Sequence, residues 1–316
     1  MSISTTLKAA IGVAMLALPA TAHAEWEPDG PITLQIGFGA GGATDTIGRA
    51  LEAAIEENTD WEVIVENKPG GGGIAMFSGL VRDDPDGLTL GMGVTMATLM
   101  NLATRGDSLP FKIDSFDYLA TVVVAPLAII APAEAPYDTV AELVEQSKAD
   151  GGYLVGFDAG PQKMILEAIN KTNGAGFELV SHKSGAEQIQ GLLGGQLQAG
   201  YGAGSHIEYL KSGDIKMLAV VTDTRQPYSP DTTTLIEQGF DYSLDPYFYI
   251  AAPKGLSAEA KEALAKALDD AINSEEMAEL IENVMQTEPR NLGPDGTEAK
   301  LNSSLDLISK LVEANK

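Results

Sequence analysis

The chain has 316 residues, with 45 acidic and 20 basic side chains and a formal net charge of -25. Phosphate contacts need clustered Lys and Arg, so this balance argues against binding of nucleic acid. The chain contains no cysteine, which excludes disulfides, a thiol nucleophile, cysteine metal ligands and the lipidated cysteine of a bacterial lipoprotein anchor.

Residues 1–24 have the pattern of an export signal. A weakly charged start at Lys8 precedes a short apolar run at 9–18, and residues 22–24 form a small-x-small cleavage site. A buried N-terminal helix is the alternative. No later stretch approaches the roughly 18 apolar residues of a membrane span. We therefore expect an exported, periplasmic protein that is cleaved after Ala24.

Strand and helix patterns then alternate along the chain. A strand-like run at 32–38 is followed by a glycine-rich turn at 39–45 and a helix whose apolar residues recur at helical spacing. Further strand-like runs are at 62–67, 88–92, 118–131, 153–157, 177–180, 198–201, 215–221 and 247–252. Residues 223–239 are expected to form a loop with one short helix, and the chain is helical from Ser257 onward. Strands separated by helices indicate βαβ units and a mainly parallel sheet.

The pattern predicts an α/β fold of two lobes joined by two extended crossings, near 118–131 and 245–252. Lobe I would contain residues 25–123 plus 245–316, and lobe II would contain residues 124–244. Ligands of open α/β sheets bind beyond the carboxyl ends of the strands. We therefore expect a ligand in a cleft between the lobes, where the turn at 39–45 faces the turns that follow Phe157, Val180 and Tyr201.

The turn at 39–45 has the features of an anion site. Small residues let the backbone approach a ligand, and the free N–H groups and dipole of a helix start favour a negative group. Because the chain is so acidic, recognition is expected to depend on short-range N–H groups at helix starts in both lobes. Asp45 complements the helix dipole, and a ligand contact through water or a ligand donor stays open beside that role. The main role expected for Ser184 is that of a capping-box residue at a helix start.

Enzyme functions are less consistent with the sequence. Gly37-x-Gly-x-x-Gly42 also fits a dinucleotide fingerprint, with Glu66 placed to hold a ribose, so an exported dinucleotide-binding enzyme is the alternative. After the signal only His182 and His206 remain, and residues 204–206 lack the flanking glycine of a nucleophile elbow. We therefore expect no catalytic residues, no metal site and no cofactor.

Several stretches resemble the substrate-binding proteins of tripartite tricarboxylate transporters, also called the Bug family. The first is Phe38-Gly-Ala-Gly-Gly-Ala-Thr-Asp45 with Arg49. Others follow in the family's order and spacing, at 65–70, 85–90, 192–197, 219–222 and 252–255. The resemblance covers essentially the whole chain after the signal.

This resemblance implies a type-II periplasmic binding protein fold that closes on a small carboxylate and delivers it to a membrane permease. We expect a monomer. A sensing module that serves a membrane kinase differs only in its partner and stays open. By resemblance, the expected ligand-binding residues are Phe38, Gly39, Ala40, Gly41, Gly42, Thr44, Asp45, Thr95, Asp158, Gly160, Ser184, Gly185 and Tyr247. Thr95 is expected in the loop after the third strand, which also faces the cleft.

Some positions depart from the family's pattern. The turn after Phe157 contains residues 161–163 where small hydroxyl residues are usual. His182 replaces a common tyrosine, Gly202 a common aspartate, and Tyr247 a common tryptophan. These departures leave the substrate open among dicarboxylates, citrate-like acids, aromatic acids and acidic amino acids.

Overall fold

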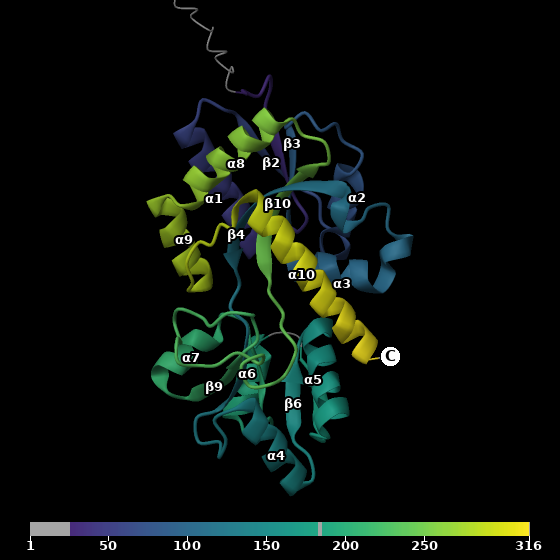
Figure 1. The fold of residues 1–316 in the computed structure, drawn as a ribbon. Coiled ribbons are helices and arrows are strands. Elements are labelled where there is room, and N and C mark those ends of the chain that lie inside the picture. The colour runs from purple at the N-terminus through teal and green to yellow at the C-terminus, as the bar shows by residue number, and fades with distance from the viewer. Residues whose placement is uncertain (1–25, 183–184, 316) are drawn as a thin grey trace, which may run out of the picture.

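The protein consists of two lobes stacked along its long axis, lobe I at the top of Figure 1 and lobe II at the bottom. The structure is a computed structural model and describes residues 26–182 and 185–315. The predicted export signal at 1–24 lies outside the described residues. Within them, no helix combines the length and the hydropathy of a membrane span.

Lobe I is built on a five-stranded sheet with the order β2-β1-β3-β10-β4. Strands β1, β2 and β3 are parallel, and β10 is inserted antiparallel between β3 and β4. The strands are β1 Ile32–Ile36, β2 Val63–Asn67, β3 Thr89–Val94, β4 Phe116–Val124 and β10 Tyr247–Pro253. The alternating pattern therefore predicted the parallel part of the sheet, and β10 returns from the other lobe to complete it.

Helices cover both faces of this sheet, and each face has its own apolar core. One core contains residues of α1, α8 and α9, and the other contains residues of α2 and α10 with α3 beside them. The helices are α1 Ala43–Asn58, α2 Ile74–Leu80, α3 Thr95–Arg105, α8 Ala258–Ile272, α9 Glu275–Met285 and α10 Gly293–Ala314. Short 3-10 turns occur at Gly71–Gly73, Gly106–Ser108 and Ile113–Ser115.

Lobe II contains a three-stranded antiparallel sheet, β8-β5-β9, and a parallel pair, β6-β7. Its strands are β5 Ala128–Pro132, β6 Leu154–Phe157, β7 Glu178–Ser181, β8 Gly200–Gly202 and β9 Ile215–Val220. Its helices are α4 Val140–Asp150, α5 Gly160–Asn173, α6 Gly185–Leu193 and α7 His206–Ser212. A parallel bridge between Val155 and Ala199 connects β6 to β8.

Three connections join the lobes. The extended run predicted at 118–131 is divided into β4 and β5, and at the break Ala125 N donates to Pro246 O of the second crossing (3.1 Å). The third connection is α10, which runs from lobe I to the upper end of α5 in lobe II in Figure 1. Its last turns share the core of lobe II through Ile308 and Leu311, and Asn315 Nδ2 donates to Met164 O of α5 (3.1 Å).

Two local predictions were wrong. Thr95 was expected in a loop after the third strand but is the first residue of helix α3. The short helix expected within 223–239 is absent, and residues 235–239 form turns. In the region of the expected helix, the backbone bonds to the end of β9 instead, because Leu235 N donates to Val220 O (2.9 Å).

Candidate ligand-binding cleft

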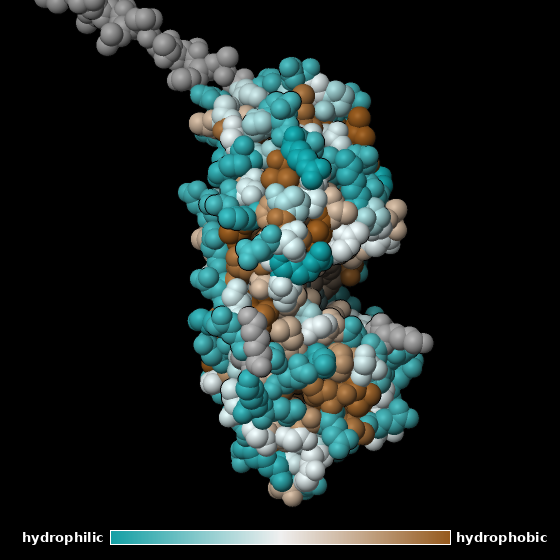
Figure 2. Space-filling view, turned by 90° about the vertical axis from the view of Figure 1, so that its right-hand side faces the viewer, coloured by the Kyte–Doolittle hydropathy of each residue, from teal (hydrophilic) through white to brown (hydrophobic). Residues whose placement is uncertain are grey.

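The carboxyl ends of the strands in the two lobes face each other across the crossings. In lobe I, β3 ends at Val94, which pairs with Phe248 directly after the second crossing, and β1 and β2 run parallel to β3. In lobe II, β8 and β9 end where β5 begins, so their last residues lie beside Ala128. Figure 2 shows the surface hollowed between the lobes at its right-hand edge. This hollow is the candidate cleft.

Three turns of lobe I converge at this edge. Asn67, the last residue of β2, donates from Nδ2 to Phe38 O in the turn after β1 (3.1 Å). Asn101 of α3 donates from Nδ2 to Gly71 O in the turn after β2 (3.3 Å). A Cβ added at Gly37 would lie 2.7 Å from the Cα of Gly73, so the two backbones can approach this closely only because residue 37 is glycine.

Asp45 is buried behind the first turn, and its carboxylate bonds to groups of that turn and its neighbours. Its residue is 4 % exposed, and its carboxylate accepts from Gly41 N (2.8 Å), Asn67 Nδ2 (2.9 Å) and Arg49 Nε (3.2 Å). The Gly41 N–H, the Asn67 amide and Arg49 together lower the pKa of Asp45, although burial opposes them. These bonds account for Asp45 without a ligand. The ligand contact also considered for Asp45 stays a prediction.

The backbone at the start of α1 retains free donors. Asp45 occupies the Gly41 N–H, and the first backbone bond of the helix runs from Thr46 N to Gly42 O (2.9 Å). Within the described part of the chain, the N–H groups of Gly42, Ala43 and Thr44 have no acceptor. Residues 39–43 are exposed. The start of α1 therefore carries three adjacent N–H groups without an acceptor among the described residues, and the helix dipole adds a partial positive charge there.

The turns of lobe II also meet at the cleft edge. After β6, Asp158 N donates to Gln162 Oε1 (2.9 Å), and α5 begins at Gly160. A Cβ added at Gly185, the first residue of α6, would lie 3.7 Å from Ser205 Oγ and 3.9 Å from Asp158 Oδ2. The turns after β6, β7 and β8 are thus neighbours. Ser184, expected as a ligand residue, lies outside the described residues.

The family model for "Tripartite tricarboxylate transporter family receptor" matches residues 47–296 of this chain. The chain belongs to this receptor family. The resemblance inferred from the motifs is confirmed, and so is the two-lobed α/β fold of a periplasmic binding protein. Members are periplasmic solute-binding proteins of tripartite tricarboxylate transport, which is a receptor class and not a class of enzymes.

Individual relatives are distant in sequence but similar over most of their length. The UPF0065 protein in the gbd 5' region of Cupriavidus necator is 29% identical over 268 residues, which cover 84% of this chain and 81% of that protein. A TctC solute-binding protein from Polaromonas, solved without ligand, has a TM-score of 0.82 and 24% identity, covering 90% of this chain and 99% of that one.

Two solved neighbours carry ligands. MatC from Rhodopseudomonas palustris, with bound malate, has a TM-score of 0.65 and 19% identity over 90% of this chain and 100% of that one. A second R. palustris protein, with adipate, has a TM-score of 0.66 and 20% identity over 91% of this chain and 97% of that one. At these identities the likeness shows the shared fold.

In this receptor, position 202 has no room for the aspartate that the family pattern favours. A Cβ at Gly202 would lie 2.3 Å from Cγ of His206, which is fully buried. His206 Nδ1 accepts from Gly204 N (3.2 Å), so Nε2 carries the proton and donates to Tyr228 Oη (3.1 Å). Burial lowers the pKa of His206 to about 4. A neutral imidazole therefore fills the space beside Gly202.

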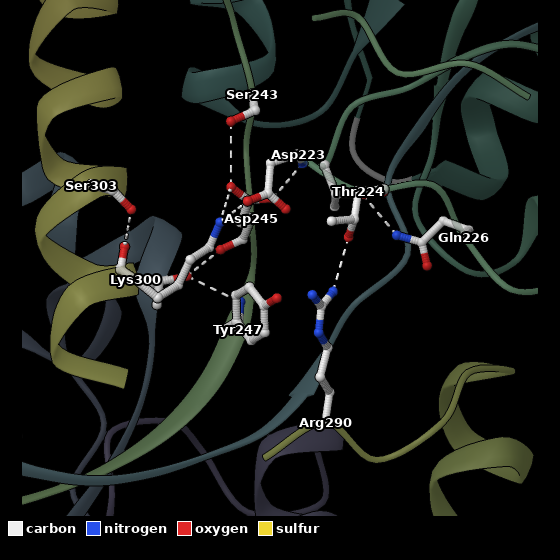
Figure 3. Close-up of polar contacts among 11 residues, drawn as sticks. Asp223, Thr224, Gln226, Ser243, Asp245, Tyr247, Arg290, Lys300 and Ser303 are labelled. Atoms are coloured by element: carbon white, nitrogen blue, oxygen red, sulfur yellow. Dashed lines mark hydrogen bonds and ion pairs between the residues drawn. The ribbon is translucent and has the colours of Figure 1, made fainter. Parts of the chain in front are cut away.

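Thr95 and Tyr247 meet at the second crossing of the receptor. Thr95 is 1 % exposed, its hydroxyl donates to the Asp245 carbonyl, and Tyr247 N donates to it (3.0 Å). Figure 3 shows the Tyr247 ring between Lys300 and Arg290, whose charged groups lie 5.4 and 5.7 Å from its centre. The Thr95 hydroxyl is thus already used within the crossing.

Sequence reasoning missed an ionic cluster at this crossing. Lys300 of α10 donates to Asp223 Oδ2 (2.5 Å), after β9 of lobe II, and to Asp245 Oδ2 (2.9 Å) in the crossing (Figure 3). Burial opposes the charge on Lys300, but Asp245 and Asp223 raise the pKa of Lys300. The three residues are far apart in the sequence and share no motif, so no local signal could have identified them.

No metal site is evident among residues 26–182 and 185–315, where no group of three or more His, Asp or Glu side chains has suitable geometry. Glu66, assigned to the ribose in the dinucleotide alternative, has a side chain that is 53 % exposed and pairs with Lys68 at 3.1 Å.

Proposed function

We propose that this receptor captures a small dicarboxylate or related organic acid between its lobes and delivers it to the permease of a tripartite tricarboxylate transporter. The supporting observation is the row of three free N–H groups at the start of α1, on the edge of lobe I that faces lobe II. An anion fits this corner because backbone donors at a helix start favour a negative group. Malate and adipate in the fold's neighbours are consistent with this class of ligand.

Short-range contacts must provide the affinity. The net charge of -25 gives no long-range attraction for an anion, and physiological salt screens charges beyond roughly 8 Å. We propose that the expected residues around the turns at 38–45, 157–160 and 184–185 supply N–H groups from both lobes. Closure then removes water from the carboxylates, and the ligand favours the closed form because it contacts both lobes there.

The remaining features of the proposal follow from the sequence. We propose export to the periplasm with cleavage after Ala24, action as a monomer, and no catalysis. Thr95 and Tyr247 would then act by shaping the crossing, since the Thr95 hydroxyl and the Tyr247 N–H are bonded to each other. Asp45 would position the first turn and keep the Gly41 N–H from the ligand.

Ala43→Pro tests the supporting observation. Ala43 is the first helical residue after Gly42, whose ψ of 169° suits the residue before a proline. Proline is favoured at a first helical position, so the substitution removes one N–H and leaves the helix intact. A bond to a charged group contributes about 1.5–3 kcal/mol. The affinity for the best acid of a carboxylate panel should therefore fall about tenfold or more.

The control is Ala258→Pro, which makes the same change at the first residue of α8, after Ser257 with ψ of 156°. Calorimetry should show unchanged affinity for this variant. Equal affinity in Ala43→Pro and the unmodified protein would refute the anion corner. Small-angle scattering with saturating acid should show a more compact molecule. A purified protein that carries the ultraviolet absorbance of a bound nucleotide would favour the dinucleotide-binding enzyme instead.

A further inference from the structure

A second pocket lies at the seam between the lobes, and none of its lining residues belongs to the turns that form the cleft. Its volume is about 260 Å³. One wall belongs to lobe II, at 224–227 after β9, and the other to lobe I, at 287–290 between α9 and α10, with Val124 of β4 between them. This volume lies just below the roughly 300–1,000 Å³ of pockets that hold drug-sized ligands, so the pocket suits a smaller molecule.

Arg290 contributes a guanidinium whose donors are mostly unused. Its backbone is fixed to β4, because Arg290 N donates to Val122 O (2.8 Å) and Arg290 O accepts from Thr121 Oγ1 (2.6 Å). Its Nη1 donates to Thr224 Oγ1 across the seam (2.9 Å), as Figure 3 shows. Within the described residues, Arg290 has no ion pair with a carboxylate. A guanidinium has five donors, so four are open to an acceptor.

Arg225, in the same pocket, differs in this respect. Its Nε and Nη2 donate to the Glu237 carboxylate at 2.9–3.1 Å, and its Nη1 donates to Pro230 O (3.0 Å). The charge of Arg225 is therefore already balanced. Among residues 26–182 and 185–315, Arg290 therefore has no anionic partner, in a chain with more than twice as many acidic as basic side chains.

Two acceptors lie in the same walls. Gln226 is 2 % exposed, and its Nε2 donates to Thr222 Oγ1 (2.8 Å), but its Oε1 is buried with no donor among the described residues. In this arrangement Thr222 Oγ1 donates to Thr224 O (2.8 Å) and accepts from the Gln226 amide. Glu288 is exposed, lines the pocket and forms no ion pair in the described part of the chain.

From these groups we propose that the seam pocket binds a small zwitterion with a carboxylate and an ammonium group, such as an α-amino acid. The carboxylate would pair with the Arg290 guanidinium, whose planar fork matches its two oxygens. The ammonium would donate to Glu288 and, after a small shift of the buried amide, to Gln226. A neutral ligand of this kind also enters an acidic protein without net repulsion.

Occupation of the seam pocket would be coupled to the cleft. The walls come from different lobes, so closure of the cleft changes their separation. A zwitterion that fits the present separation favours the arrangement in which the cleft is hollow (Figure 2), and it lowers the affinity of the cleft for its own ligand. By linkage the cleft ligand must weaken the zwitterion by the same factor.

Calorimetry with L-alanine, acetate and methylammonium tests the site on the full mature chain. L-Alanine should bind saturably, and the two single-charge probes should bind at least tenfold more weakly. Arg290→Gln and Glu288→Gln should each weaken L-alanine at least tenfold. Arg225→Gln, which removes a charge of the same pocket that is already balanced, should leave the affinity within twofold. Arg290→Lys, which keeps the charge and loses the fork, should lie in between and serves if Arg290→Gln does not fold.

Ala43→Pro separates this site from the cleft. It should bind L-alanine as the unmodified protein does, whereas Arg290→Gln should keep its affinity for the cleft acid. Absence of saturable L-alanine binding, or equal binding by Arg290→Gln, would overturn the seam site while leaving the proposed function intact. Loss of L-alanine binding in Ala43→Pro would place the amino acid in the cleft and would likewise overturn it.

Discussion

His206 should make the stability of this receptor depend on pH between 7 and 5. The imidazole is fully buried beside Gly202 and holds Gly204 N and Tyr228 Oη as a neutral group. Burial lowers its pKa to about 4, from an ordinary value of 6.5. Below pH 6.5 residue His206 is protonated in the unfolded chain but stays neutral in the folded protein. The stability that depends on a neutral His206 is therefore fully present above pH 6.5 and is lost as the pH falls toward 4.

The size of this loss follows from the two pKa values. One pKa unit corresponds to about 1.4 kcal/mol, so the full difference is about 3 kcal/mol, of which about 2 kcal/mol is lost between pH 7 and pH 5. Most carboxylates in proteins titrate below pH 5. The window from pH 7 to 5 therefore separates the histidine from the acidic residues.

Urea unfolding of the unmodified protein and of His206→Gln at pH 7, 6 and 5 measures the effect. The variant should be less stable at pH 7 but should lose at least 1.5 kcal/mol less on going to pH 5, by the linkage above. Tyr228→Phe, which keeps the buried imidazole, is the control and should retain the pH dependence. An equal loss in His206→Gln and the unmodified protein would refute the assignment of a buried neutral histidine.

Four further substitutions test the structure by urea unfolding. Lys300→Met should lower the free energy of unfolding by about 3–5 kcal/mol, because the fully buried Asp245 side chain loses its cation. Adding Asp245→Asn to this variant should restore part of the lost stability, and strictly additive effects of the two substitutions would contradict the ion pair between Lys300 and Asp245. Asp45→Ala should cost about 2–4 kcal/mol through its three bonds, and a loss under about 0.5 kcal/mol would show that they do not form in solution. Gly202→Ala should cost about 1–3 kcal/mol, as its methyl group overlaps His206, and unchanged stability would contradict that packing. Asp117→Asn should reduce the loss of stability in acid: burial raises the pKa of Asp117, but bonds from Gly255 N, Lys254 Nζ and Leu256 N outweigh burial and lower the pKa. The charged Asp117 therefore stabilises the folded protein above about pH 4, and this stabilisation is lost at lower pH. An acid unfolding profile unchanged in the variant would argue against those bonds.

Local patterns predicted the elements whose causes are local. The glycine-rich turn at 39–45 and the helix after it are specified by neighbouring residues, and the structure shows both. Capping residues likewise specified α4, α8 and α9, where Thr139, Ser257 and Ser274 accept from N–H groups three residues later. Each of these capping contacts joins residues within one helical turn, so the local sequence alone is enough to predict where the helix begins.

Features that depend on the order of strands were not predictable in this way. Helix α3 begins at Thr95 with no side-chain cap, and the hydroxyl of Thr95 is bonded instead to the crossing about 150 residues later. The cluster of Lys300, Asp223 and Asp245 forms because α10 returns along the crossings. Charged residues of this kind look like solvated surface in the sequence, and only the fold shows that they are buried together.

The anion site proposed at the start of α1 has an acidic residue at its centre, and this is consistent with capture of an acid. Asp45 remains charged, because its bonds lower its pKa, but its charge is compensated by Arg49 at 3.1 Å and by the positive end of α1. The Gly41 N–H that it occupies fixes the turn, so the next three N–H groups would be held in place before the proposed ligand arrives. A turn ordered in advance loses less conformational entropy on binding. The affinity for an anion can therefore depend on an internal anion, provided that the internal one is fully bonded and the backbone donors beside it are not.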